Sequence, residues 1–201
     1  MISFNTNEKI ILFTGRPNSG KTSLIKRLTK KKTLRVGKRP GTTSSFLRII
    51  VTPQLSIIDS PGYGKIFGAS KSKQERIKDQ YIDFIENEGH RILLAFHIVD
   101  LISFSEVSKR LDAKGYIPID VEIVMFLQET QGKVFVIGNK IDRFSSKREL
   151  SNVQKELKER MPLEVESYFI SAKKGIGVTS IKKKIKATLI EEFGPNYAHV
   201  I

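Results

Sequence analysis

The 201-residue sequence contains no cysteine and no run of 18 apolar residues. The missing thiols exclude disulfide bonds, thiolate catalysis and zinc sites built on sulfur, and they are neutral about the redox compartment. The lack of a long apolar run argues against a membrane-spanning helix. The first residues, MISFNTNEKIILFTG, show neither a basic leader nor a small-residue cleavage site. We therefore expect a soluble, cytoplasmic protein.

Acidic residues are the minority among the charged residues, with 21 Asp and Glu against 35 Lys and Arg, which gives a net charge of +14. Such an excess predicts a polyanionic partner, either RNA or a membrane surface, and says nothing about the fold. We favour RNA, and expect neither a membrane nor DNA as partner. The length suits one well-packed domain over residues 1–201, because no linker between two domains is evident.

Short apolar runs alternate with longer amphipathic stretches along the chain. Two runs follow each other without a helix between them and predict a hairpin, whereas the others predict βα units. Uninterrupted apolar runs are typical of strands buried on both faces. We expect an α/β fold with a mostly parallel, six-stranded sheet, helices on both faces, and ligands at the carboxyl ends of the strands. The hairpin is formed by the runs 45–52 and 55–59. The other runs are 10–14, 92–100, 121–129, 134–140 and 165–171.

A glycine-rich sequence, GRPNSGKTS, follows the first of these runs directly and satisfies the pattern G-x-x-x-x-G-K-[ST]. Glycines let backbone N–H groups turn toward phosphate oxygens, and the following helix adds its positive N-terminal end. We expect Lys21 to reach the β- and γ-phosphates and the Thr22 hydroxyl to ligate Mg²⁺. The strand before and the helix after argue against a chance match. The candidate nucleotide-binding residues are Gly15, Asn18, Ser19, Gly20, Lys21, Thr22 and Ser23.

The sequence DSPGYG begins at Asp59, the last residue of the run at 55–59. An acid at this place is suited to hold Mg²⁺ through water, and the Gly62 N–H is then placed to meet a γ-phosphate. Thr42 and Thr43 lie in a basic stretch, RPGTTSS, that we expect to fold over the metal when the γ-phosphate is present. Plain turns are the alternative interpretation of both stretches.

Two polar loops, NKID and SAK, follow the last two predicted strands. The Asp142 carboxylate can accept from both N1–H and the exocyclic amine of guanine, and adenine offers no such pair of donors. We expect Asn139 to fasten the loop and approach the base edge, and the Lys140 stem to cover the ring face. Ala172 is expected to donate its N–H to the guanine carbonyl. The candidate base-binding residues are Asn139, Lys140, Asp142, Ser171, Ala172 and Lys173.

Together these motifs resemble the translation-factor branch of GTPases and, within it, the EngB/YihA/YsxC family of ribosome-assembly GTPases, over almost the whole chain. DSPGYG with the preceding PGTT points to this family rather than to other small GTPases. The resemblance implies a Ras-like P-loop domain that hydrolyses GTP to GDP as a switch in ribosome subunit assembly, with switch segments near 33–46 and 60–75. It also implies that Thr43 closes on Mg²⁺, with Thr42 as the fallback. The implied metal ligands are then Thr22, Thr43 and Asp59, and the implied catalytic residues are Lys21, Thr43 and Gly62.

The stretch GYIPIDVEIVMFLQE resembles archaeal versions of the family. Bacterial members have a shorter connection at this place, so the chain carries one additional short segment, of unknown role, between Asp100 and Asp120.

Tyr63 stands at the position where Ras-like signalling GTPases carry a glutamine that orients the attacking water. A phenol cannot reproduce the paired donor and acceptor of the amide, so we expect slow unaided hydrolysis. Some families that resemble this chain use a monovalent cation held partly by an Asn of the phosphate loop, and Asn18 occupies that position. A potassium site at Asn18 is therefore a hypothesis, beside a simple turn role for this residue.

Basic residues cluster at 26–39 and in KKKIK at 182–186. The first cluster reaches into the first implied switch, which would couple affinity for ribosomal RNA or a ribosomal subunit to the nucleotide state. Solvated helix faces are the alternative for the second cluster. His90, His97 and His199 show no ligand spacing, so core or surface roles are expected. Two other functions stay open: a regulatory GTPase whose switches bind an effector protein, and a P-loop kinase or ATPase.

Overall fold

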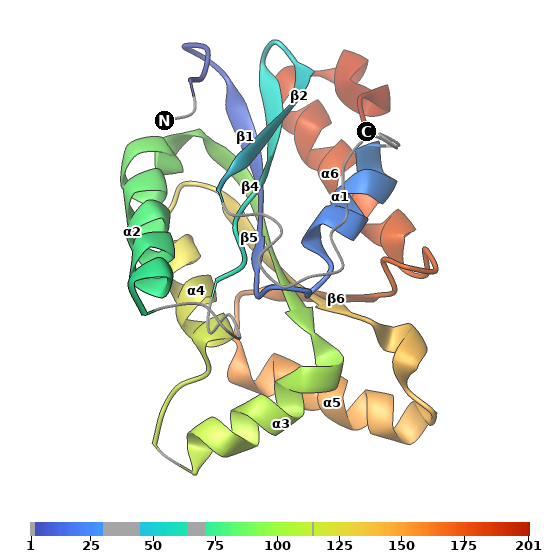
Figure 1. The fold of residues 1–201 in the computed structure, drawn as a ribbon. Helices are drawn as coiled ribbons and strands as arrows, with labels where there is room; N and C mark the ends of the chain where they lie inside the picture. Colours follow the sequence, from blue (N-terminus) through green and yellow to red (C-terminus); the bar gives the residue numbers. More distant parts are fainter. Residues whose placement is uncertain (1–2, 30–44, 64–70, 114) are drawn as a thin grey trace.

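A computed structural model of the chain describes residues 3–29, 45–63, 71–113 and 115–201, with the side chains of 71–74 left out. Its strands form one sheet in the order β2-β3-β1-β4-β5-β6 (Figure 1). β2 pairs with β3 in antiparallel fashion as the expected hairpin, and the other neighbouring pairs are parallel. The predicted mostly parallel sheet is confirmed. The strands are β1 (Lys9–Gly15), β2 (Leu47–Thr52), β3 (Leu55–Asp59), β4 (Ile92–Asp100), β5 (Lys133–Asn139) and β6 (Glu166–Ile170).

Helices cover both faces of the sheet, as expected. Successive side chains of a strand point to opposite faces. In β1, Ile11 and Phe13 pack in the cluster that contains α1 and α6, while Ile10 and Leu12 pack in the cluster that contains α2 and α4. Because both faces are buried, the run is apolar without alternation. The helices are α1 (Lys21–Thr29), α2 (Lys71–Glu88), α3 (Leu101–Asp112), α4 (Ile119–Gln128), α5 (Lys147–Arg160) and α6 (Val178–Phe193). The 3-10 turns are η1 (Gly89–Arg91), η2 (Ile141–Arg143) and η3 (Pro195–His199).

The additional segment between Asp100 and Asp120 consists of helix α3 and a connection to α4. The Asp100 carboxylate begins α3 as its N-cap, because Oδ1 accepts from the Ile102 N–H at 3.1 Å. The apolar run at 121–129 is helix α4 rather than a strand. Its Ile123 faces the cluster under α2, whereas Val124 faces the cluster of α3 and α5.

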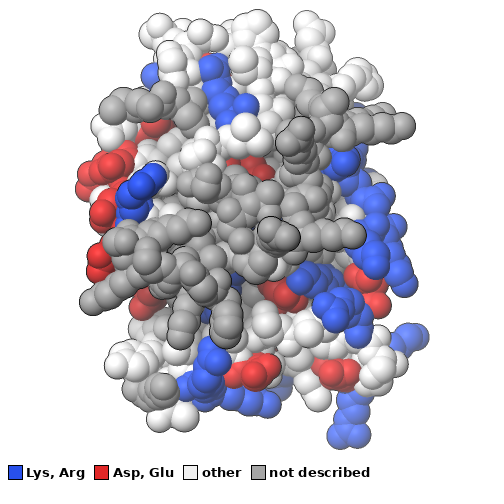
Figure 2. Space-filling view, in the orientation of Figure 1, with Lys and Arg blue, Asp and Glu red and all other residues white. Residues whose placement is uncertain are grey.

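Charged side chains are unevenly spread over the surface. Figure 2 shows Lys and Arg gathered along the right-hand and lower margins of the face seen in Figure 1, interspersed with a few acidic residues. None of the helices in the described ranges is long and apolar enough to cross a membrane.

A buried carboxylate, Glu8, ties the segment before β1 to the hairpin. It is 1% exposed, and it accepts from Arg48 Nε at 3.0 Å, from the Asn5 N–H at 2.9 Å and from the Ser56 hydroxyl. Burial by itself raises the pKa of Glu8. The hydrogen bonds from Ser56, Asn5 and Arg48, together with the Arg48 charge, lower it by more, so the pKa of Glu8 lies below its ordinary value.

We expect Glu8→Gln to lower the free energy of unfolding at neutral pH by about 1–3 kcal/mol, because buried partners lose charge-assisted hydrogen bonds. In the wild type this stabilisation is complete above the unfolded-state pKa, about 4.3, and is lost as the pH falls through the lowered folded-state pKa. Urea unfolding of both proteins at several pH values should show the difference shrinking as the pH falls below about 4. A difference that is independent of pH contradicts the assignment.

Candidate nucleotide-binding site

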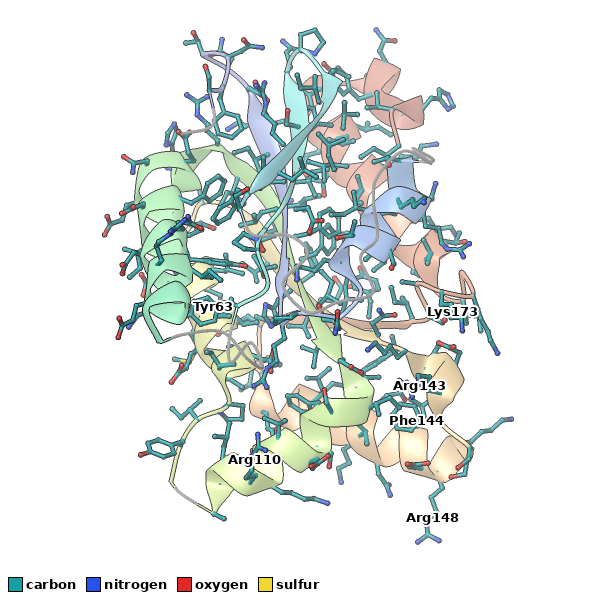
Figure 3. The ribbon with its side chains drawn as sticks, viewed as in Figure 1. Tyr63, Arg110, Arg143, Phe144, Arg148 and Lys173 are labelled. Carbon is teal, nitrogen blue, oxygen red and sulfur yellow. The ribbon has the colours of Figure 1, made fainter. Side chains whose placement is uncertain are left out.

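The motif loops meet at one edge of the sheet. β1 lies between β3 and β4, so the chain leaves it toward both sides, and such a switch point is where parallel sheets bind ligands. GRPNSGK begins in the last residue of β1, DSPG in the last residue of β3 and NKID in the last residue of β5, whereas SAK follows β6. In Figure 3, Tyr63 lies beside α2 on one side of this edge, and Lys173 and Arg143 lie on the other side. The fold therefore brings the predicted phosphate and base loops to one rim.

Lys21 is a buried cation in the first turn of α1, with 6% of its surface exposed. Its Nζ donates to the carbonyl oxygens of Gly15 at 2.9 Å and Arg16 at 3.0 Å. Burial lowers the pKa of Lys21 to about 8, and the negative charges of Asp59 and Asp120 oppose this shift. The loop thus curls around an ammonium group, which is the arrangement that a phosphate group requires.

Thr22 and Asp59 form a pair of hard oxygen donors beside this ammonium. Thr22 Oγ1 donates to Asp59 Oδ2 at 2.5 Å, and the fully buried Asp59 Oδ1 has no hydrogen-bond partner among the described residues. Burial raises the pKa of Asp59, while the Thr22 hydrogen bond and the Lys21 charge lower it. An unpartnered buried carboxylate oxygen next to a hydroxyl fits Mg²⁺, which prefers oxygen ligands.

Within the described ranges, no group of three His, Cys, Asp or Glu could hold a metal ion by itself. This agrees with a Mg²⁺ site that is completed by water and phosphate oxygens. Thr43, expected as the third protein ligand, and its fallback Thr42 lie outside the described residues.

The DSPG segment runs against the phosphate loop. The Ser60 N–H donates to the Phe13 carbonyl at 3.1 Å, and the Tyr63 N–H donates to the Gly15 carbonyl at 3.2 Å. A Cβ atom on Gly62 would lie 2.6 Å from the backbone nitrogen of Pro17. Only glycine permits this approach, so the two motifs expected to act on one phosphate are already in contact.

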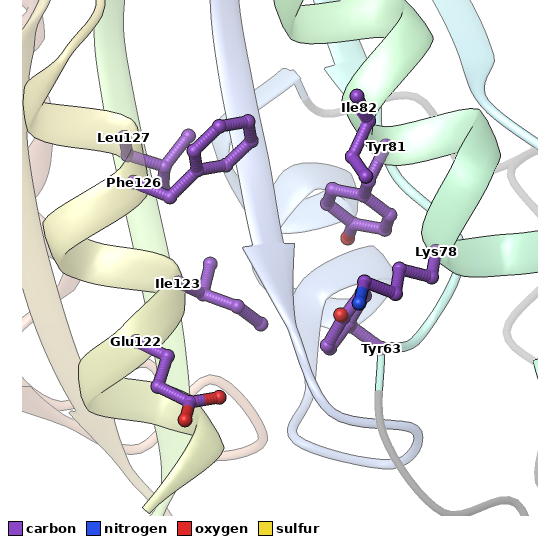
Figure 4. A pocket seen from close by; sticks show the side chains of 8 residues that line it. All are labelled: Tyr63, Lys78, Tyr81, Ile82, Glu122, Ile123, Phe126 and Leu127. Carbon is purple, nitrogen blue, oxygen red and sulfur yellow. The ribbon is translucent and has the colours of Figure 1, made fainter. Parts of the chain in front are cut away.

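Tyr63 is a packing residue in this structure. Its ring meets that of Tyr81 edge-on, with centroids 5.1 Å apart, and both belong to a small apolar cluster with Ile77. Figure 4 shows Tyr63 lining a pocket between α2 and α4, with a volume of about 210 Å³, opposite Glu122 and Ile123. Burial raises the pKa of Tyr63, and the charge of Glu122 adds to the shift. The phenol therefore stays protonated and supports the helices around it.

Asn139 joins the phosphate loop to the SAK loop. Its side chain is 3% exposed, its Nδ2 donates to the Ser19 carbonyl at 2.8 Å, and its Oδ1 accepts from the Ala172 N–H at 2.9 Å. A Cβ on Gly20 would lie 2.2 Å from this Nδ2, so the glycine makes room for the amide. We expected the Ala172 N–H to donate to guanine. In the structure this N–H donates to the Asn139 amide oxygen, and the contact with guanine stays a prediction.

Asp142 and Lys140 occupy the turn after β5. Lys140, at a φ of 74°, directs its Nζ to Asp100 Oδ2 at 2.5 Å, so the residue that caps α3 also anchors the lysine expected over the base. The Ser171 hydroxyl holds the pKa of Asp142 below its ordinary value, and the charges of Lys174 and Lys173 lower it further. Asp142 is therefore a carboxylate at neutral pH, with only acceptors to offer a base.

Arg27 supports the SAK loop, a role that the sequence did not indicate. We counted it in the basic cluster at 26–39 as a contact for RNA. In the structure its Nε donates to the Ala172 carbonyl at 2.8 Å and its Nη2 to the Lys173 carbonyl at 2.6 Å. Arg27 holds the SAK loop against α1, because a planar guanidinium fits two successive carbonyls.

This fold and these loops define a P-loop GTPase. A family model described as "50S ribosome-binding GTPase" matches residues 10–140. Probable GTP-binding proteins EngB are similar to the chain: that of Pyrococcus horikoshii is 41% identical, over 92% of this chain and 85% of its own, and that of Archaeoglobus fulgidus is 34% identical, over 90% and 92%. A crystal structure of a probable GTP-binding protein engB has a TM-score of 0.77 at 39% identity, covering 90% of this chain and 99% of its own. The chain belongs to the EngB family of GTP-binding proteins.

A more distant structure, Aquifex aeolicus Era Y63A bound to GDP.AlF4-, has a TM-score of 0.63 at 22% identity and covers 90% of this chain and 56% of its own. It shares the fold alone. The EngB relatives carry the stronger conclusion that the chain binds guanine nucleotides and is a GTPase.

Proposed function

We propose that this GTPase is a nucleotide-dependent switch that acts on ribosomal particles during subunit assembly, as a single domain over residues 1–201 in the cytoplasm. The observation that carries the proposal is a guanine-nucleotide site on a chain with a net charge of +14. Such a charge favours a polyanionic partner. The description of the matching family model, a 50S ribosome-binding GTPase, supports the same partner.

The residues of the phosphate loop would divide the work on GTP. Lys21 binds the β- and γ-phosphates, and the Gly62 N–H contacts the γ-phosphate. Mg²⁺ would be held by Thr22, Asp59 and Thr43, and it supplies neutralisation of charge on the phosphate oxygens. Backbone N–H groups supply the remaining phosphate contacts, from Gly15, Asn18, Ser19, Gly20 and Ser23.

The base would be selected by Asp142, with the Lys140 stem along the ring and Asn139 holding the loops together. Ser171 orients Asp142, and Lys173 lies at the edge of the site. Tyr63 packs against Tyr81 and Ile77 of α2 and offers no amide to the attacking water, which supports slow unaided hydrolysis. A potassium ion at Asn18 stays a hypothesis, because this exposed residue adopts a φ of 62° that Asn tolerates without an ion. Equal GTP turnover in sodium and potassium buffers would remove it.

Exposed cations lie beside the base-binding loops. Arg143, Arg148 and Lys173 project from η2, α5 and the SAK loop on one side of the molecule, with Phe144 between them (Figure 3). Arginine and lysine bind nucleic-acid phosphates without sequence preference, and an aromatic ring among them offers a stacking surface for a base. These residues support RNA as the partner. Residues 30–39 of the basic cluster at 26–39 lie outside the described residues.

Cosedimentation with purified ribosomal subunits tests the proposal. We expect binding to be stronger with a non-hydrolysable GTP analogue than with GDP. We also expect the affinity to fall at least about tenfold between 50 and 200 mM salt, because the counterions that binding releases from the RNA gain less entropy at higher salt. Association that is insensitive to salt, or absent with every nucleotide, contradicts the proposal. Capture of a single protein partner that survives RNase treatment would favour the alternative of an effector-binding GTPase.

A further inference from the structure

A chain of buried polar side chains connects the phosphate loop to helix α4. Asp120, in the first turn of α4, is 2% exposed, and its Oδ2 lies 2.8 Å from Arg16 Nε. Its Oδ1 accepts from His97 Nε2 of β4 at 3.0 Å. His97 Nδ1 is 2.9 Å from the hydroxyl of Thr14, the residue before Gly15 in β1. Three elements thus meet around one carboxylate.

A contribution to stability does not by itself explain the buried Asp120 carboxylate and its charged partners. A buried ion pair costs much of its attraction in lost hydration, and an apolar replacement is often as stable. Burial by itself raises the pKa of Asp120, yet the His97 hydrogen bond and charge and the Arg16 charge bring it below its ordinary value. Asp120 is therefore a buried, ionised carboxylate, and its position beside the phosphate loop calls for a functional explanation.

Arg16 transmits the position of Asp120 to the centre of the loop. Its side chain pairs with Asp120, and its carbonyl oxygen accepts from Lys21 Nζ at 3.0 Å. The same residue therefore has one end fixed on α4 and the other on the ammonium that faces the phosphates. The contact with Asp120 is an ion pair, because the buried Arg16 Nε has no hydrogen-bond partner among the described residues.

We propose that Asp120 is a positioning residue of the GTP site, which preforms the phosphate loop by fixing Arg16 and, through its carbonyl, Lys21. This inference rests on the assignment of the loop as the GTP site. A loop that is already ordered binds its ligand without the entropy cost of ordering.

Asp120→Asn tests the proposal, because it keeps the shape of the side chain and removes its charge. We expect the Kd for GTP and the KM to rise about tenfold, with kcat changed less than about twofold, because a lost contribution to loop order weakens ground state and transition state alike. The control is Asp112→Asn, which breaks another Asp–Arg pair, between the last residue of α3 and Arg160 at the end of α5, at 2.6 Å. GTP affinity of the control should equal that of the wild type.

A double-mutant cycle with Arg16→Gln separates positioning from general destabilisation. If Asp120 acts through Arg16, the double variant binds GTP no more weakly than the weaker single variant. Additive losses, or unchanged GTP affinity in Asp120→Asn beside a lowered melting temperature, overturn the proposal. Should Asp120→Asn not fold, Arg16→Gln alone decides, since Asp120 keeps its bond to His97: wild-type affinity in that variant overturns the proposal. Failure of the wild type to bind GTP would instead refute the assignment of the site.

Discussion

Asp142→Asn is expected to weaken GTP binding by about a hundredfold and to let xanthosine triphosphate bind in its place. The carboxylate can accept from both N1–H and the exocyclic amine of guanine, whereas an amide directs its N–H₂ against that amine. The loss of one charge-assisted hydrogen bond, which contributes about 1.5–3 kcal/mol, corresponds to this factor at the upper end of the range. Xanthine carries a carbonyl where guanine carries the amine, so the asparagine amide matches it with one acceptor and one donor.

Direct titration with three nucleotides checks the prediction within one pair of proteins. Wild type should prefer GTP strongly over xanthosine triphosphate, the variant should reverse the order, and ATP should bind weakly to both. Since Asp142 lies at a half-exposed turn, the melting temperature should change little. Equal affinity of the wild type for ATP and GTP would refute the base-binding assignment as a whole. If the variant still prefers GTP, a residue other than Asp142 selects the base.

The strands were predictable from the sequence because they are short, mostly apolar runs, and β1, β3 and β4 are buried on both faces. The run of α4 looks similar for a different reason, since the adjacent residues Ile123 and Val124 pack in two separate clusters. A short apolar run in a helix and a central strand look alike in a list of apolar residues. Only tertiary packing distinguishes them, and α3, with its polar outer face, gave no comparable signal.

The residues expected to touch the nucleotide were readable as motifs because each group is contiguous. Their supports were not, since these are single residues far away along the chain: Arg27 holds the SAK loop across 145 positions, and Asp100 holds Lys140 across 40. Arg27 stands in a basic run and Asp100 at the end of a strand, and both positions are common for these residue types, so the sequence did not indicate their long-range contacts. His97, expected in a core or surface role, is a core residue whose partners Thr14 and Asp120 no local pattern indicates.

Lys21→Met is expected to reduce GTP turnover by a factor on the order of a hundred to a thousand while leaving the protein as stable as the wild type or more so. Loss of one preorganised donor to a reacting oxyanion has an effect of this size. The stability argument is independent of catalysis. Burial lowers the pKa of Lys21 to about 8 despite the charges of Asp59 and Asp120, which means that the fold disfavours the lysine charge. An apolar side chain of similar length removes this cost, and this gain offsets the loss of the hydrogen bonds to the Gly15 and Arg16 carbonyls.

Single-turnover hydrolysis and thermal unfolding of the same samples measure both effects. Lys155→Met, the same change at an exposed lysine of α5 paired with Glu159, should alter neither. The opposite signs expected for activity and stability distinguish a functional lysine from a structural one, because a structural lysine would lose stability and activity together. Turnover within a few-fold of the wild type, or a lower melting temperature in Lys21→Met, would show that the loop curls around this ammonium for the sake of the fold and not for phosphate.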